Sequence, residues 1–191
     1  MRITVQTAAV ATVLFVTACG TSPKPAAPAA PAAEVPTTST AKQAVANLAS
    51  ASGSLVSGKV TLVPMGKGVH ITGVVGGLPP SSPHGFHVHE KGDCSAVDAT
   101  SAGPHFNPFN TPHGKTDAGA HHAGDMNNIT TDAEGVAKID VHLTGVTLGG
   151  GAVNDIANRA LIVHAAPDDY ASQPAGNAGA RVACGVIKVI Q

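Results

Sequence analysis

The chain has 191 residues, of which 43% are hydrophobic, 3% aromatic and 12% charged, and its formal net charge is −1. This length suits one medium-sized domain with short appendages, and the apolar fraction is enough to form a buried core. The balanced charge and the absence of a Lys/Arg run exclude the basic surface that a nucleic-acid backbone requires, so we expect no nucleic-acid partner. The 22 glycines and 14 prolines disfavour a helix bundle, whereas the 10 histidines indicate metal or proton chemistry.

The first 18 residues have the pattern of a signal peptide. Arg2 supplies a positive charge, residues 8–16 form an apolar run, and small residues follow. The run is shorter than the roughly 20 residues that a transmembrane helix needs. The next residue, Cys19, lies in a segment typical of a bacterial lipobox, whose cysteine is acylated, although ordinary secretory cleavage beside an incidental cysteine is the alternative. We therefore expect an exported protein on the periplasmic or cell-envelope face, anchored to a membrane by lipidated Cys19.

A tether follows the signal peptide. Residues 19–40 are rich in proline and alanine, and their prolines are too closely spaced for a helix. The folded domain is therefore expected over residues 41–191.

Short β-branched or alternating runs dominate this domain. They predict strands at residues 60–63, 69–75, 86–89, 136–143, 160–164 and 186–190. Residues 44–48 could form a helical turn, and the Gly/Ser-rich segment after them fits a first strand equally well. The pattern predicts an all-β fold, a Greek-key β-barrel or sandwich of about eight antiparallel strands with long metal-binding loops.

Residues 91–128 show neither a strand nor a helix period. A loop of this length needs something other than a core to order it. Cysteine, histidine and aspartate side chains in this segment could supply a disulfide and a metal site.

Two groups of candidate ligands carry this chemistry. His87 and His89 leave the same face of a predicted strand, and His164 ends another strand. Several neutral imidazoles together suit copper. A second set, His113, His122 and Asp125, could combine with one further imidazole around structural zinc. The spacing alone does not decide which histidine joins the two sets.

The other histidines have ordinary explanations. We expect His70, His84 and His142 to be surface or satisfied core residues, and His121 to be a solvated neighbour of His122.

Five motifs carry a specific resemblance to a known family. In chain order they are GFHVHE at residues 85–90, GPHFNP at 103–108, HAGD at 122–125, LIVH at 161–164 and GNAGARVACG at 176–185. These motifs resemble, in the same order, those of copper-zinc superoxide dismutases, and the match covers essentially all of the predicted domain. Cys94 lies eleven residues before His105, and this loop length looks like that of the bacterial branch, so we expect a member of the exported lipoprotein branch of bacteria. A β-sandwich architecture is also what the resemblance implies.

The resemblance assigns roles to individual residues. It implies copper ligands at His87, His89, His105 and His164, and zinc ligands at His105, His113, His122 and Asp125, so that His105 bridges the two ions and also takes part in proton transfer. It further implies that Asp168 links one ligand of each ion, and that Arg181 guides superoxide, the substrate, to the copper. The chain would then be an enzyme that converts superoxide to dioxygen and hydrogen peroxide by copper redox cycling, with structural zinc.

The cysteines and the last loop complete these expectations. With Cys19 in the lipobox, Cys94 and Cys184 form a pair, and two free thiols are the alternative. The segment between His164 and Arg181 is short and acidic, so guiding charges that relatives keep there are in doubt, and Arg181 could instead pair with an aspartate of that segment.

Two rival functions and the assembly state are open at this stage. The same fold could serve as a non-catalytic metal-binding or copper-delivery module, and a zinc hydrolase is a weaker alternative. The sequence is compatible with a monomer or a homodimer.

Overall fold

A computed structural model describes residues 34–191. The signal peptide, Cys19 and most of the tether therefore lie outside the described residues. Among residues 34–191, no helix has the length and hydropathy needed to cross a bilayer.

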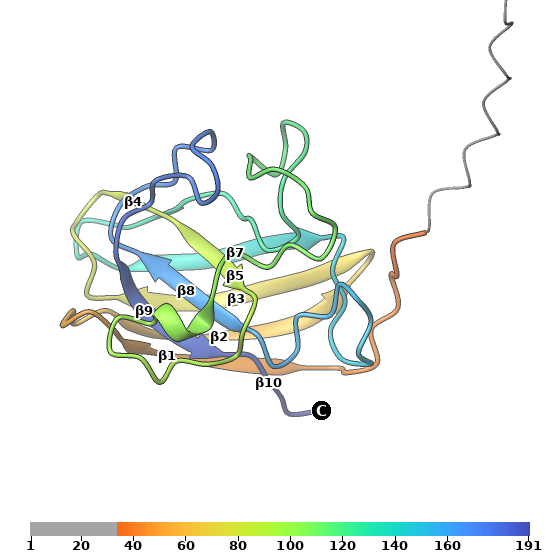
Figure 1. Cartoon of the computed structure of the whole chain (residues 1–191). Coiled ribbons are helices and arrows are strands. Elements are labelled where there is room, and N and C mark those ends of the chain that lie inside the picture. The colour runs from red at the N-terminus through yellow and green to blue at the C-terminus, as the bar shows by residue number, and fades with distance from the viewer. Residues whose placement is uncertain (1–33) are drawn as a thin grey trace, which may run out of the picture. The chain divides into compact units, whose positions relative to one another are not determined.

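The described chain is a curled antiparallel sheet (Figure 1). Its strands are β1 (Ala44–Ser50), β2 (Ser57–Met65), β3 (Gly68–Gly76), β4 (Pro83–His84), β5 (Phe86–His89), β6 (Ile129–Thr130), β7 (Ala137–Thr144), β8 (Ala160–His164), β9 (Arg181–Val186) and β10 (Lys188–Val189). The main sheet has eight strands in the order β5-β8-β9-β1-β2-β3-β7, with β10 paired to β1, and β4 pairs with β6. This arrangement confirms the predicted all-β class; the main sheet has the eight strands expected, and the short pair β4–β6 adds two more.

The apolar pattern of the strands explains the core. In β1, residues Ala44, Ala46 and Leu48 are buried, and their neighbours are half-buried or exposed. The same alternation in β2 and β7 directs Val60, Leu62 and Ile139 into the interior, as the period of two in a β-strand requires. Both β5 and β8 are buried along their whole length, so the histidines on them lie in a rigid part of the molecule.

Two sequence predictions were wrong in detail. The segment 44–48 is neither a helical turn nor a residue run before the first strand, because it forms that strand itself. Every second residue of this segment is apolar and buried, and this period of two favours a strand. The predicted strand at 186–190 is divided, because Ile187 turns inward and exchanges backbone hydrogen bonds with Asn158 and Arg159. The longer strand lies earlier, at Arg181–Val186.

The long irregular segment was predicted correctly. Between β5 and β6 the structure describes only one short 3-10 helix, η1 (Thr100–Ala102). A disulfide joins Cys94 in this segment to Cys184 in β9, with the two Cα atoms 5.8 Å apart, which confirms the predicted pair. The segment is thereby tied to the middle of the sheet.

Candidate metal centre

Four imidazoles meet beside β5. His87 and His89 belong to β5, and His164 ends the neighbouring strand β8. His105 comes from the irregular segment and forms an isolated bridge with His89. One ring nitrogen from each of these four buried histidines lies within 4.8 Å of the others.

The nitrogens that face one another lack any hydrogen-bond partner, although they are buried. They are Nδ1 of His87 and Nε2 of His89, His105 and His164. A buried polar atom without a partner is costly, so this convergence indicates a bound ligand. Four imidazole nitrogens suit copper, and the donor set therefore fits the ion that the sequence predicted.

The opposite ring nitrogen of each of these histidines has a partner. Nδ1 of His89 lies 2.8 Å from the carbonyl oxygen of Gly103, and Nδ1 of His164 lies 3.3 Å from that of Gly179. Because carbonyl oxygens only accept, these Nδ1 atoms are the protonated ones, which leaves both Nε2 lone pairs free to bind a metal.

A second cluster lies on the other side of His105. His105, His113, His122 and Asp125 are all buried and also converge within 4.8 Å. The Asp125 carboxylate lies 2.8, 3.0 and 3.3 Å from Nδ1 of His105, His113 and His122. Three nitrogens and one oxygen form the closed set typical of structural zinc, so this cluster fits zinc.

His105 is the residue shared by both clusters. Its ring centroid lies 4.2 Å from that of His87 and 5.3 Å from that of His113. Its Nε2 faces the four-imidazole set, and its Nδ1 faces Asp125. The structure thus selects the shared histidine that spacing alone left open.

Asp168 connects the two clusters a second time. Its Oδ2 lies 2.9 Å from Nε2 of His87, and its Oδ1 lies 2.9 Å from Nε2 of His113. A carboxylate in this position fixes the orientation of both rings and favours metal binding through their Nδ1 atoms.

Burial and charge set the protonation of the site. Burial lowers the pKa of His105 to about 4 and that of His164 to about 3, and it lowers the pKa of His89 well below its usual value. These rings are neutral at pH 7, as a metal ligand must be. Burial opposes the ionised form of Asp125, yet hydrogen bonds from three histidines hold its pKa below the usual range.

His113 behaves differently. Burial works against its charged form, but hydrogen bonds to Asp125 and Asp168 outweigh burial and raise the pKa of His113 to about 9. In the metal-free protein, its imidazolium therefore bridges two carboxylates.

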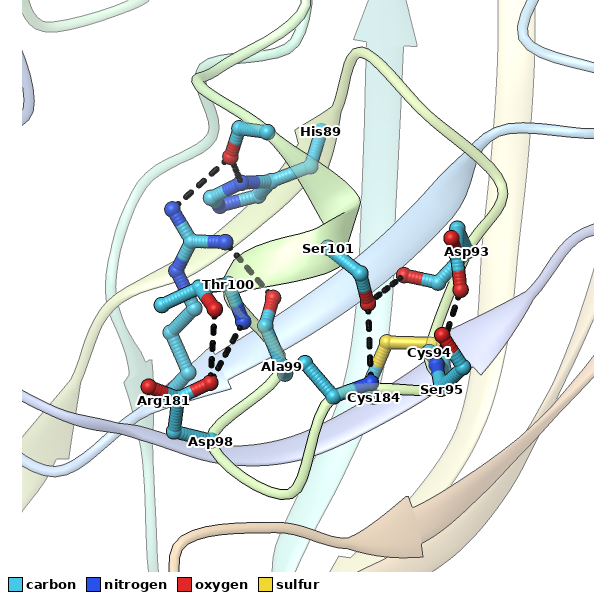
Figure 2. The surroundings of a disulfide bond; sticks show 12 residues. His89, Asp93, Cys94, Ser95, Asp98, Ala99, Thr100, Ser101, Arg181 and Cys184 are labelled. Atoms are coloured by element: carbon cyan, nitrogen blue, oxygen red, sulfur yellow. Dashed lines mark hydrogen bonds between the residues drawn. A yellow bond between two sulfur atoms is a disulfide. The ribbon is translucent and has the colours of Figure 1, made fainter.

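Arg181 lies at the rim of the four-imidazole cluster. It lines a cavity of about 640 Å³ together with His89, His105 and His164. Its Nη1 and Nη2 atoms donate to the carbonyl oxygens of Ala99 and Gly103, both at 2.7 Å (Figure 2). Within residues 34–191 it forms no ion pair with an aspartate, so the alternative pairing is wrong.

The disulfide and η1 support this arginine. Figure 2 shows the disulfide of Cys94 and Cys184 on one side of Ala99 and Arg181 on the other. Ser101 Oγ donates to the carbonyl of Asp93 at 2.9 Å and accepts from the amide of Ala96 at 3.1 Å. The segment whose carbonyls bind Arg181 is therefore itself held in place by the Ser101 hydrogen bonds.

The remaining histidines make contacts outside both clusters. His84 is buried and contacts Ser82 Oγ and the carbonyl of His164, whereas His70, His121 and His142 form hydrogen bonds nearer the surface. The structure therefore separates these four from the ligand candidates, as expected.

Two amide side chains at the site went unnoticed in the sequence. Asn128 donates from Nδ2 to the carbonyl of Asp168 at 2.9 Å and accepts from the amide of Asp168 at 2.8 Å. Gln173 likewise forms two hydrogen bonds with the backbone of His113: it accepts from the amide and donates to the carbonyl, each at 2.9 Å. No motif or spacing marked either residue, because each recognises backbone atoms brought close only by the folded loops.

Comparisons with known proteins agree with this geometry. Residues 56–187 match the family model for copper/zinc superoxide dismutase. Among similar proteins, two Cu-Zn superoxide dismutases of Aquifex aeolicus are 43% and 46% identical to this chain. The first alignment covers 76% of this chain and 86% of the relative, and the second covers 69% and 79%.

Solved structures with the same architecture include the clock protein EA4, with a TM-score of 0.70 and 37% identity over 80% of this chain and 98% of that one. A SOD-like protein from Bacillus subtilis has a TM-score of 0.69 and 33% identity over 76% of this chain and 97% of that one. The family model and the two dismutases show that the chain belongs to the copper/zinc superoxide dismutase family.

Proposed function

We propose that the two clusters are the copper and zinc sites of a superoxide dismutase. Copper would be held by His87, His89, His105 and His164, and zinc by His105, His113, His122 and Asp125. The observation that carries this proposal is the convergence of four buried imidazole nitrogens that have no hydrogen-bond partner, next to a second buried set of three imidazoles and one carboxylate that shares His105. Neither cluster lacks a donor, and both donor sets match the ion assigned to them.

The reaction converts two superoxide ions and two protons to one dioxygen and one hydrogen peroxide. Bound copper supplies the one-electron oxidation of the first superoxide and the one-electron reduction of the second. The protein then has to attract the anion, keep the ligand rings neutral and deliver protons. His105 can hold a proton at Nε2, the atom that it presents to the copper set.

Arg181 is proposed to attract the substrate. Superoxide is a small anion, so charge is the main feature by which a protein can recognise it. The Arg181 guanidinium is positioned by two carbonyl oxygens and lines the cavity that reaches His89, His105 and His164. Since no carboxylate pairs with it within the described residues, its charge is available to an entering anion.

The zinc cluster and Asp168 are proposed to position His105. Asp125 lies against three rings of the zinc set, and Asp168 contacts one ring of each set. This support keeps His105 oriented toward both clusters during the reaction.

The test is to measure dismutation, copper content and zinc content in one preparation. We expect one copper and one zinc per chain, together with a rate that is lost when the copper is removed and regained when copper is added. A preparation with both ions bound and no dismutation would refute the proposed activity and support a metal-binding role instead.

We further propose that this enzyme is exported and anchored to a membrane as a lipoprotein. It is supported by the signal-peptide pattern, the lipobox cysteine and the Pro/Ala-rich tether in residues 1–40. Replacing Cys19 by Ala should release active protein from the membrane fraction, because the tether separates the anchor from the folded domain. An active Cys19→Ala variant that stays membrane-bound would contradict lipid anchoring.

A further inference from the structure

We infer that Gln173 is a positioning residue for the zinc site and connects it to the wall of the substrate cavity. The inference rests on the proposed metal centre, because it assumes that His113 is a zinc ligand. It concerns the segment between β8 and β9, which carries Asp168, Gln173 and five of the residues that line the cavity.

The Gln173 side chain satisfies both backbone groups of His113. Its Oε1 accepts from the amide of His113, and its Nε2 donates to the carbonyl of His113, each at 2.9 Å. An amide side chain offers one acceptor and two donors, so this pairing fixes which way the Gln173 amide faces. The two residues are 60 positions apart in the chain.

The contact is one of two reciprocal clamps between the same loops. Asn128, from the loop that carries the zinc ligands, grips the backbone of Asp168 in the β8–β9 segment with two hydrogen bonds. Gln173, from the β8–β9 segment, grips the backbone of His113 in the zinc-ligand loop. Between these clamps lies the contact of Asp168 Oδ1 with His113 Nε2. His113 is therefore held by its ring through Asp168 and by its backbone through Gln173.

Tight packing next to Gln173 makes the arrangement sensitive to small shifts. At Gly176, an added Cβ would lie 2.7 Å from Nε2 of His113, and it would overlap the Asp168 carboxylate. Gly176 has a φ of 66°, which glycine adopts readily. The backbone thus passes directly over the contact between Asp168 and His113.

The residues that follow Gln173 form one wall of the substrate cavity. They are Pro174, Ala175, Asn177, Ala178 and Gly179. A chain held at Gln173 by the zinc-ligand loop therefore has its cavity-lining part placed relative to His113. The Gln173 contact therefore joins this wall of the cavity to the backbone of a zinc-ligand candidate.

The test replaces Gln173 by Met, which has a similar length but forms no amide hydrogen bonds. We expect zinc affinity, measured by competition with a chromogenic chelator on copper-free protein, to fall about 10-fold. This is the lower end of the 10–100-fold that partners of metal ligands typically contribute. The d–d absorption of Co²⁺ bound at the zinc site should also shift, because the orientation of His113 changes. Copper affinity should change less than twofold.

The matched control is Ser172→Ala, which removes a 2.6 Å hydrogen bond to Asp169 in the same segment and leaves the His113 backbone contact. It should keep the parental zinc affinity and Co²⁺ spectrum. A second variant, Gln173→Ala, should reproduce the effect of Gln173→Met. Circular dichroism of the metal-free variants checks that the sheet is retained.

Three results would overturn the inference. They are a parental zinc affinity and Co²⁺ spectrum in Gln173→Met, an equal loss in Ser172→Ala, and an equal weakening of copper and zinc binding. Since every readout is a binding measurement, these results are independent of whether the enzyme dismutates superoxide.

Discussion

The charge of Arg181 offers the sharpest test of how the enzyme attracts its substrate. A positive charge about 5 Å from an anion contributes roughly 1 kcal/mol in water and about 3 kcal/mol at an effective dielectric constant near 20. Since about 1.4 kcal/mol corresponds to a factor of ten, loss of the charge alone should slow the reaction by roughly 5-fold to 150-fold. The half-buried guanidinium lines an open cavity, so the effect lies between these limits. Arg181→Glu also reverses the charge, and we expect at least a tenfold decrease at low ionic strength.

Pulse radiolysis over a range of salt concentrations provides the measurement. Salt should slow the parent enzyme more than the Arg181→Glu variant. In the parent, screening weakens the attraction between Arg181 and superoxide, whereas in the variant it weakens the repulsion between Glu and superoxide. Arg181→Lys should fall in between, because lysine keeps the charge but cannot span the carbonyls of Ala99 and Gly103 as a guanidinium does. Lys188→Glu, an equal charge change on exposed β10, is the control and should have little effect. Equal rates and equal salt slopes in Arg181→Glu and the parent would refute the guiding role.

Three further predictions concern the metal centre and the disulfide. His105→Ala should retain copper on three imidazoles, weaken zinc strongly and reduce dismutation, whereas normal zinc affinity and rate would show that His105 does not serve both sites. In the metal-free protein, the raised pKa of His113, about 9, means that its proton stabilises the fold fully below pH 6.5 and that this contribution is lost as the pH rises through 9. Zinc must displace that proton, so zinc affinity should rise about tenfold per pH unit between pH 7 and 9, and calorimetry in two buffers should detect the release of about one proton; a flat profile would contradict the bridged imidazolium. Replacing Cys94 and Cys184 by Ser should lower the free energy of unfolding in urea by about 2–4 kcal/mol, because the bridge closes a separation of 90 residues, and an unchanged midpoint would argue against this contribution.

Much of the fold could be predicted from local sequence because its strands are either alternating or fully buried. The runs at 86–89 and 160–164 coincide with β5 and β8. The run at 44–48 gave no clear signal, because alanine has no preference for a sheet and only pairing with β2, β9 and β10 determines its structure. The strand at Arg181–Val186 was misplaced for the same reason, since alanine, cysteine and glycine occupy its centre.

The candidate ligands could be found in the sequence because metal sites need particular side chains. Their partners could not, because backbone carbonyls and amides exist at every residue. The carbonyls of Ala99 and Gly103, and the backbone groups gripped by Asn128 and Gln173, become recognisable only when the loops are in place.

The carbonyl oxygen of Gly103 accepts from two residues that otherwise have separate tasks. It lies 2.8 Å from Nδ1 of His89 and 2.7 Å from Nη2 of Arg181. One carbonyl oxygen thus accepts hydrogen bonds both from a candidate copper ligand, His89, and from Arg181 at the cavity rim. Because both contacts end on the same atom, a displacement of this carbonyl would disturb both side chains together. Gly103 has a φ of 73° and a ψ of −162°, a conformation accessible almost only to glycine. Substitution there would therefore disturb ligand geometry and anion attraction together, and compensating changes elsewhere would have to restore both at once.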